Sequence, residues 1–373
     1  MFLAVKELLH SKTKFLLFAV IIVLISWLVF ILNGLGNGLA TLAAASFQNM
    51  KADYVIYERG ARASMSRSLL SEDLVAAAEQ LPGVEAAAPM GSSMATALKG
   101  EGASDEDKVD IAVLGIVPGS FLEPAVIEGK GLDASKPYEV IVNDTMKKEG
   151  FQIGDTFSLE RTNLSLTIVG FVKDQTYNHV PSVFVPIGTW REMTFAAPGS
   201  DRGIASPVNA IMLQGRDIEP GKIDAEFGNT ETVTRSQAIQ GIPGYKEESG
   251  TIMMMLGFLI VISAMVIGVF FYVLTLQKTY QFGILKAIGA RNGFLSRAIV
   301  SQVFLLSLVS IAAGVLLTYA TAAILPEGMP FHLEAQTIAM YAVVLLIIAV
   351  LSSWISVRRI SKIDPLIALG KVE

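Results

Sequence analysis

The chain has 373 residues, of which 52% are hydrophobic and 17% are charged; soluble domains carry roughly 25% charged residues, so the composition favours a membrane protein. It contains no cysteine, which excludes disulfides, thiolate metal sites and cysteine nucleophiles. The net charge of −5 argues against nucleic acid as a partner.

The first predicted element is a membrane-spanning helix. Residues 15–32 are apolar and uncharged, and the uncharged run continues to Met50. Because about 20 apolar residues cross a bilayer core of roughly 30 Å, we predict a span with an outward extension over residues 15–49, preceded by a terminal segment of residues 1–14. A cleaved signal peptide is the alternative interpretation, but the apolar core is too long and no Ala-x-Ala site follows it closely.

Two glycines near the end of this first span share one side of the helix. Gly34 and Gly38 are spaced i, i+4, and such small faces let helices approach each other closely. We expect this face to lie at a dimer interface with a second copy of the chain, or to open a slot toward the outer leaflet. An ordinary flexible helix end is the simpler interpretation.

Residues 50–250 follow and are predicted to form a mixed α/β domain, since roughly 200 residues are enough for a self-sufficient core. The segment "SEDLVAAAEQLPGV", which begins with Ser71, has the start and stop signals of a capped helix. The segments "KVDIAVLGIV", "YEVIVND" and "LSLTIVGFV" predict strands. The longer segment "FQIGDTFSLERTNLSLTIVGFV" predicts two strands joined by a tight turn at Gly154-Asp155.

Three more apolar runs predict three more spans, so the fold expected is one span, the α/β domain, then three spans. Basic residues cluster before the first span, between the second and third, and after the fourth, whereas the loop "EGMPFHLE" has none. Positive residues mark the cytoplasmic side, which places both termini in the cytoplasm and the α/β domain outside a plasma membrane. The predicted segments are spans at 251–277, 298–326 and 335–357, a cytoplasmic loop at 278–297 and a cytoplasmic tail at 358–373.

The cytoplasmic loop carries the pattern of a short amphipathic helix. Its apolar set is Phe282, Ile284, Leu285 and Ile288, with Lys286 and Arg291 elsewhere on the helix and Gly289 as a stop. A basic amphipathic helix serves either an anionic lipid surface or a groove in a partner protein. The residues alone leave both interpretations open.

The loop segment "LQKTYQFGILKAIGARNGFLSRAIVSQ" and the closing "KIDPLIALG" resemble the permease family that includes the macrolide exporter MacB, the lipoprotein-release permeases and the cell-division permease FtsX. The chain departs from the family pattern before Gly283, where Gln281 or Phe282 stands in the region of the usual acidic residue. The resemblance covers nearly the whole chain. It implies a four-span membrane protein with an extracellular domain like the MacB periplasmic core.

The family resemblance also implies a mechanism. In that family the loop is a coupling helix that sits in a cleft of a separate ATPase subunit, which is the role implied for Phe282, Ile284, Leu285, Lys286, Ile288 and Arg291. The chain has no G-x-x-x-x-G-K-[ST] phosphate loop, so it is expected to have no cofactor and no enzyme activity, and its partner would bind ATP. The implied assembly is a type VII ABC transporter with two permeases and two ATPases, in which ATP-driven closure reshapes the outer domain.

A narrower resemblance concerns the substrate. The segment "MFLAVKELLHSKTKFLLFAVIIVLISWLVFILNGLGNGLA" is similar to the start of the haem-efflux permeases of Gram-positive bacteria, which implies export of haem or another flat amphiphile from the membrane. Haem requires an apolar slot, an iron ligand and a partner for its propionates. The candidate haem-binding residues are Tyr177, His179, Tyr245, Glu248, Met253 and Met254; no other metal site is expected.

Each haem candidate has a simpler interpretation. Tyr177 and His179 in "DQTYNHVPSVFVP" stand two apart and would face the same way on a strand, but a polar edge strand ended by Pro181 explains them as well. Tyr245 and its charged neighbours resemble an interfacial belt, and methionines inside a span usually pack. The alternative functions are export of antimicrobial peptides or lipoproteins, and an FtsX-like mechanical transmitter that moves no substrate.

Overall fold

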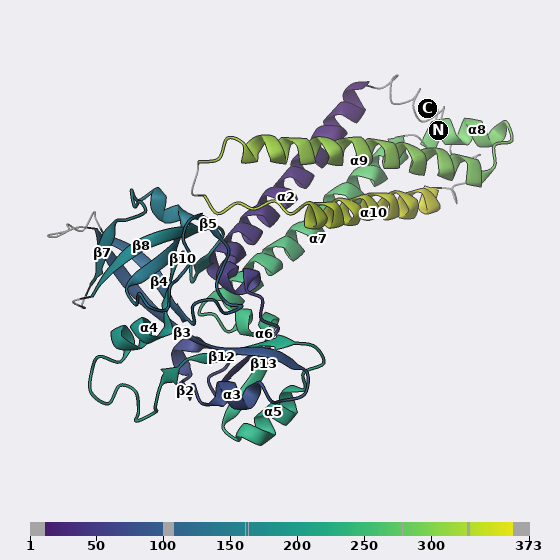
Figure 1. The fold of residues 1–373 in the computed structure, drawn as a ribbon. Helices are drawn as coiled ribbons and strands as arrows, with labels where there is room; N and C mark the ends of the chain where they lie inside the picture. The colour runs from purple at the N-terminus through teal and green to yellow at the C-terminus, as the bar shows by residue number, and fades with distance from the viewer. Residues whose placement is uncertain are drawn as a thin grey trace. The chain divides into compact units, whose positions relative to one another are not determined.

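A computed structural model gives the fold of the chain and describes residues 12–99, 108–160, 162, 164–277, 279–326 and 329–360 (Figure 1). The chain divides into two compact units. The helical unit comprises the residues up to Gly38 and from Gly250 onward, and the outer domain comprises Leu39–Ser249. The first eleven residues of the predicted N-terminal segment and the predicted tail from residue 361 lie outside the described residues.

Four helices of the described chain are long and apolar enough to cross a membrane, which confirms the predicted number of spans. Their apolar side chains form one core that includes Val29, Phe271 and Leu345. The helices are α2 (Lys12–Asn49), α7 (Tyr245–Gln277), α9 (Asn292–Ala322) and α10 (Ala335–Ile360), with the short α8 (Thr279–Ala287) between α7 and α9.

Several helix ends lie beyond those that hydropathy predicts, whereas α9 ends at Ala322, before the predicted end of the third span at residue 326. Helix α9 begins at Asn292, so residues 292–297, which the sequence placed in the cytoplasmic loop, form its first turns. Helix α10 continues to Ile360, past the predicted end of the fourth span at Val357. The physical reason is that hydropathy reports the lipid-compatible part of a helix, whereas its length depends on backbone hydrogen bonds that tolerate polar side chains.

The outer domain is built on an 11-stranded sheet in which β3 (Val84–Lys99) is shared between two groups of strands. The first half of β3 pairs with β12 and the second half with β4 and β7. The other strands are β1 (Tyr54–Glu58), β4 (Lys108–Ile116), β5 (Val126–Gly129), β6 (Glu139–Asn143), β7 (Thr156–Leu159), β8 (Ser165–Val172), β9 (Thr176–Tyr177), β10 (Val180–Pro186), β12 (Ala210–Gly215) and β13 (Thr230–Thr234). Strands β4, β6 and β8 confirm three of the sequence predictions.

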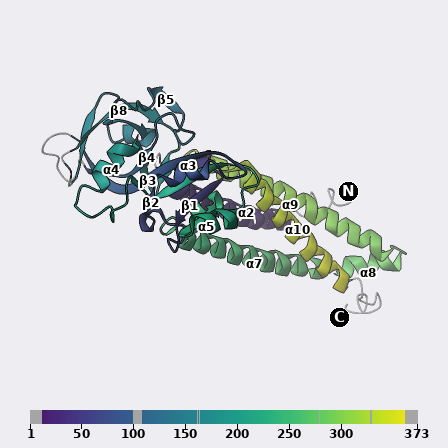
Figure 2. The same cartoon turned by 60° about the horizontal axis from the view of Figure 1, so that its bottom comes forward.

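Both faces of this sheet are buried, which explains the nearly continuous apolar runs of its strands. In β4, Val113 packs into one core while Ala112 and Leu114 pack into the other. The first core is covered by α3 (Leu74–Ala78), α4 (Ile187–Thr194) and α5 (Pro220–Phe227) (Figure 2). The second core includes Ala44 and Phe47 from the end of α2 and Ala238 from α6 (Arg235–Gln240). The outward extension predicted for the first span is therefore part of the outer domain.

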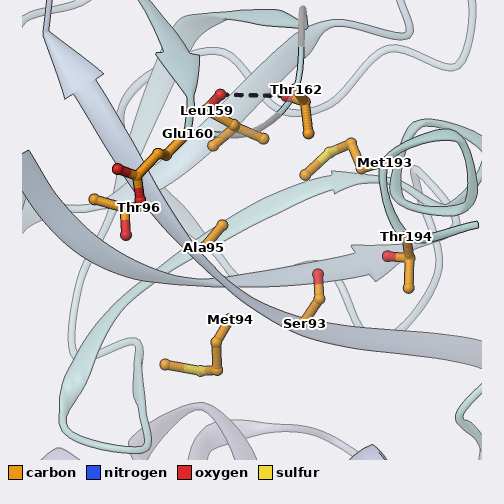
Figure 3. Close-up of a pocket in the computed structure, with 9 residues that line it drawn as sticks. All are labelled: Ser93, Met94, Ala95, Thr96, Leu159, Glu160, Thr162, Met193 and Thr194. Atoms are coloured by element: carbon orange, nitrogen blue, oxygen red, sulfur yellow. Dashed lines mark hydrogen bonds between the residues drawn. The ribbon is translucent and has the colours of Figure 1, made fainter. Parts of the chain in front are cut away.

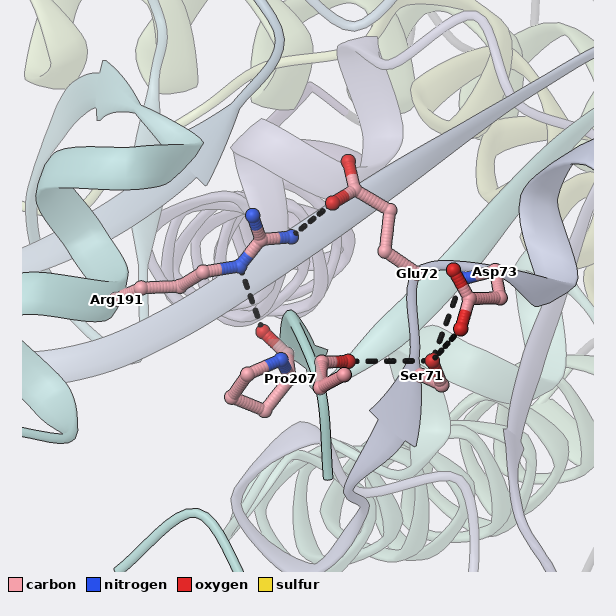
Figure 4. Close-up of polar contacts among 6 residues, drawn as sticks. Ser71, Glu72, Asp73, Arg191 and Pro207 are labelled. Atoms are coloured by element: carbon pink, nitrogen blue, oxygen red, sulfur yellow. Dashed lines mark hydrogen bonds and ion pairs between the residues drawn. The ribbon is translucent and has the colours of Figure 1, made fainter. Parts of the chain in front are cut away.

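The helix predicted from Ser71 is wrong in its start and length. Ser71 lies in β2 (Leu70–Ser71), which pairs with β11 (Pro207–Val208), and α3 begins three residues later. The hydroxyl of Ser71 donates to the Asp73 carboxylate and to the carbonyl of Ala205 (Figure 4). Pairing with a distant strand and these local bonds compete with helix formation at serine.

Arg191 ties α4 to this two-stranded sheet. Its Nη2 donates to Glu72 Oε2 at 2.7 Å and its Nε to the carbonyl of Pro207 at 3.0 Å (Figure 4). The predicted turn at Gly154-Asp155 also lies elsewhere than predicted, because it precedes β7 and does not join β7 to β8. The changed start of α3 arises from the pairing of β2 with the distant β11, whereas β7 pairs with its neighbour β8 as well as with β3.

Candidate functional sites

The first candidate site is α8, whose end has the geometry of a Schellman motif. Gly289 has a φ of +100°, and its N–H donates to the carbonyl of Lys286 at 2.9 Å. The N–H of Ala290 donates to the carbonyl of Leu285, also at 2.9 Å. Both bonds satisfy carbonyls that have no partner inside the helix, which confirms the predicted stop at Gly289.

The side chains around α8 are unevenly exposed. Ile288, which lies just past the end of the helix, is 78% exposed, and Tyr280 is 53% exposed. Arg291 is exposed, whereas Ile284, Leu285 and Lys286 are half-buried, and the side chain of Phe282 lies outside the described set. Tyr280 lies at the start of α8, and Ile288 and Arg291 lie just past its end, so the helix is flanked at both ends by exposed apolar and basic side chains of the kind that partner proteins bind.

The second candidate site lies in the outer domain, at the hairpin of β9 and β10. Val180 pairs with Tyr177, so Asn178 and His179 form the two-residue turn, with φ values of +52° and +67°. The prediction that Tyr177 and His179 face the same way on one strand is therefore wrong. Two positive φ angles characterise a type I′ hairpin turn, which breaks the alternation of side chains.

Tyr177 is turned into the core of the outer domain. It is 5% exposed, and its ring centroid lies 5.6 Å from that of Phe47. Burial raises the pKa of Tyr177 to about 12, and a hydrogen bond with Ser92 opposes that rise. A buried, neutral phenol is poorly suited to bind iron as a phenolate, so the structure disfavours Tyr177 as a haem ligand.

Replacing Tyr177 by phenylalanine is expected to reduce the loss of stability at alkaline pH. In the unfolded chain the phenol ionises near its ordinary pKa of 10.0, whereas in the folded chain the pKa is about 12, so the folded state holds the proton more tightly. The free energy of unfolding therefore falls as the pH rises from about 10 to about 12, by an amount on the order of 3 kcal/mol. Thermal unfolding of the full chain in detergent across this pH range measures it, and an unchanged slope would contradict the assignment.

His179 and Glu248, which the sequence treated as candidates from separate segments, meet in the outer domain. His179 Nε2 lies 3.2 Å from Glu248 Oε2, and both side chains are partly exposed. Glu248 lies in the first turn of α7. The sequence carries no local signal for this pairing, because it depends on how the hairpin packs against the helices.

Tyr245 lines a pocket of about 370 Å³ in the outer domain, together with Gln48, Arg235, Ser236, Ile239 and Gln240. Arg235 donates through Nη1 to the carbonyl of Met50 at 2.7 Å. The sequence did not single out Arg235, although the start of α6, where Arg235 lies, carries a recognisable sequence signal. Thr234 and Gln237 form a capping box at the start of α6, and Thr-x-x-Gln is the sequence signature of that motif.

The two predicted methionine ligands belong to the helical unit, whereas this pocket belongs to the outer domain. Met253 and Met254 lie on α7 in the helical unit, where they are 74% and 56% exposed, and neither lines the Tyr245 pocket. Among the described residues no group of three His, Asp or Glu is arranged to hold a metal ion. Tyr245 is thus a predicted haem residue that lines a cavity of the described outer domain.

A further cavity of about 330 Å³ opens on the outer domain beside β3 and the end of α4 (Figure 3). Met193 and Leu159 contribute apolar surface, and Thr96 and Thr194 contribute hydroxyls. Its carboxylate, Glu160, is paired with Lys108 at 3.2 Å. Methionine can ligate haem iron, but the described lining residues include no cation to pair with the propionates.

The glycine face of α2 has an occupant within the same chain. A Cβ added at Gly34 would lie 2.6 Å from the ring of Phe331, and one at Gly38 would lie 2.3 Å from the carbonyl of Pro330. The N–H of His332 donates to the carbonyl of Gly34 at 3.0 Å. This face therefore does allow close approach, as predicted. The segment that approaches it is the connection between α9 and α10 of the same chain, which argues against the predicted dimer interface.

Two family models match the chain. The model of the MacB-like periplasmic core domain matches residues 15–220, and the model of the FtsX-like permease C-terminal part matches residues 253–365. Together they cover the first span, most of the outer domain, α8 and the last three spans.

Two relatives match this chain over almost its full length. The chain is 25% identical to a putative hemin transport system permease protein, HrtB, of Staphylococcus epidermidis, over 99% of each chain. It is 24% identical to an uncharacterized ABC transporter permease of Mycobacterium tuberculosis, again over 99% of each chain. Among solved structures, the extracellular domain of the ABC-type transporter YknZ covers 49% of this chain and 99% of its own, at 12% identity and a TM-score of 0.35.

Proposed function

Because the chain belongs to the family of ABC transporter permeases that join a MacB-like periplasmic core domain to an FtsX-like C-terminal part, we propose that it is the permease subunit of a haem exporter driven by a separate ATPase. The observation that carries the proposal is the similarity to permeases named for hemin transport, which spans 99% of each chain. Family membership confirms the resemblance drawn from the loop and tail segments.

The proposed contact with the ATPase is α8. It is a short helix between α7 and α9 that ends in a fixed turn at Gly289, and it presents Ile288, Tyr280 and Arg291 at the surface. In the proposed assembly two copies of the chain bind two ATPases, both termini lie in the cytoplasm and the outer domain lies outside. ATP binding and hydrolysis belong to the partner, and closure of the two ATPases moves α8 and α7.

The proposed haem site is the Tyr245 pocket. Tyrosine is a known axial ligand of haem iron, and a guanidinium pairs strongly with carboxylates such as the haem propionates. Tyr245 and Arg235 line the same cavity, together with the apolar side chain of Ile239. Its volume of about 370 Å³ falls within the usual range for small-ligand pockets, roughly 300–1,000 Å³.

Titration of the detergent-purified full chain with haemin tests this site. The wild-type chain is expected to give a saturable, shifted Soret band, and Tyr245→Phe is expected to lose it because the phenyl ring offers no oxygen to iron. Tyr177→Phe is the matched control and should bind haemin like the wild type, since its hydroxyl is buried. No saturable binding by the wild-type chain would refute haem as the substrate, and loss of the band in both variants would refute the choice of pocket.

A further inference from the structure

The turn between β9 and β10 contains an unfavourable residue. Both of its central positions have positive φ, +52° at Asn178 and +67° at His179. Asparagine tolerates this conformation, but the second position of a type I′ turn strongly favours glycine, because a Cβ there approaches the following carbonyl. A histidine at such a position implies a reason to keep its side chain.

The backbone of the turn is bound to the end of α2. The N–H of Asn178 donates to the carbonyl of Ala43 at 2.8 Å and the N–H of His179 to the carbonyl of Leu42 at 3.2 Å. Thr176 Oγ1 donates to the carbonyl of Thr41 at 3.1 Å. These three consecutive carbonyls belong to a helix that continues to Asn49, so each uses its second lone pair to hold the hairpin. None of these bonds needs the imidazole.

The imidazole reaches a different helix. His179 Nε2 lies 3.2 Å from Glu248 Oε2, in the first turn of α7. One turn residue thus contacts α2 through its backbone and α7 through its side chain. A glycine at this position would relieve the backbone strain and keep the bond to Leu42, but it would lose the contact with Glu248.

We propose that His179 is a positioning residue, a latch that fixes α7 against α2 at the outer domain so that movement of α7 is passed on to the outer domain. Both helices continue from the outer domain into the helical unit. This inference rests on the proposed function in one respect, namely that an ATPase moves α7. It does not depend on what the permease exports.

The decisive variant is His179→Gly in the full chain, with Asn178→Gly as its matched control. Both substitutions remove a side chain from the same turn and relieve the same kind of strain, so both are expected to keep or raise the unfolding temperature. In His179→Gly alone, hydrogen exchange over residues 242–252 is expected to become about tenfold faster, because the start of α7 loses an anchor to the rest of the domain. In the assembled transporter, His179→Gly is expected to leave the rate of ATP hydrolysis nearly unchanged. The amount of substrate exported per ATP hydrolysed is expected to fall several-fold.

Glu248→Ala provides the second half of the test. It is expected to accelerate hydrogen exchange over residues 242–252 as much as His179→Gly does. The double variant is expected to exchange no faster than either single variant, because the two side chains act as one unit. The absence of native cysteine permits a chemical rescue: with His179→Cys and Glu248→Cys, a short bismaleimide should restore slow exchange and coupled export, and a monofunctional maleimide should not.

Three results would overturn the latch: exchange over residues 242–252 that is unchanged in His179→Gly, equal acceleration in Asn178→Gly, or additive effects of His179→Gly and Glu248→Ala. The exchange measurement needs neither substrate nor ATPase. A chain that binds no haemin but shows the expected exchange pattern therefore refutes the proposed substrate and supports the latch, and the reverse pattern refutes the latch alone.

Discussion

Reversing the charges of Lys286 and Arg291 and placing proline at Leu285 is expected to abolish binding of the ATPase subunit, and with it export. Leu285 lies inside the nine-residue helix α8, where proline removes a backbone donor and clashes with the preceding turn. Breaking a helix interior costs about 3 kcal/mol or more, which corresponds to association roughly 100-fold weaker. The reversed charge at exposed Arg291 adds an unfavourable contact with whatever acidic surface the wild-type arginine meets.

Copurification of the ATPase with the full-length permease from membranes measures this effect, alongside protection of cells against haemin. The matched control reverses the charges of Lys173 and Arg216, two exposed residues of the outer domain, and is expected to retain the ATPase. If the α8 variant were to bind the ATPase and protect cells as well as the control does, α8 would not be the coupling element.

Trp190→Ala is expected to produce the largest loss of stability in the outer domain. Trp190 is 0% exposed and lies over Gly91 and Gly115, which pair across β3 and β4. A Cβ added to Gly91 would lie 2.2 Å from the indole, and one added to Gly115 would lie 2.5 Å from the Trp190 side chain. The aromatic ring therefore packs directly on the two glycines, and its removal leaves a cavity between α4 and the sheet.

Loss of a buried tryptophan costs about 3–5 kcal/mol, a large share of the typical 5–15 kcal/mol that stabilises a domain. For a domain of this size that loss lowers the unfolding temperature by roughly 6–20 °C, which thermal unfolding of the detergent-purified chain measures. Trp190→Phe is the control. It keeps most of the ring and removes an indole N–H that has no hydrogen-bond partner among the described residues, so it should retain most of the stability.

A double-mutant cycle separates this packing from a general loss of fold. Gly91→Ala alone is expected to destabilise the domain, because the methyl group collides with the indole. In the Trp190→Ala background the same methyl group enters the cavity, so its effect is expected to shrink or change sign. Additive effects of the two substitutions would contradict the packing described here.

The sequence by itself determined the parts of this protein that depend on local chemistry. The four spans follow from apolar runs, since the hydropathy of a helix is a property of its own residues. Strands β4, β6 and β8 follow from β-branched apolar segments, and the stop at Gly289 follows from the one residue that adopts positive φ without strain. The family was also recognisable from the loop around α8, because its residues are contiguous.

The candidate sites in the outer domain were decided by the tertiary structure alone. His179 meets Glu248, Arg235 reaches the carbonyl of Met50, and Trp190 covers a glycine pair on two other strands. The sequence suggested that Tyr177 and His179 act together, but the turn sends one into the core and the other to α7. Such contacts depend on which distant strands become neighbours and on where a turn reverses the chain. Local propensity and periodicity carry no information about either, because many pairings bury the same apolar residues equally well.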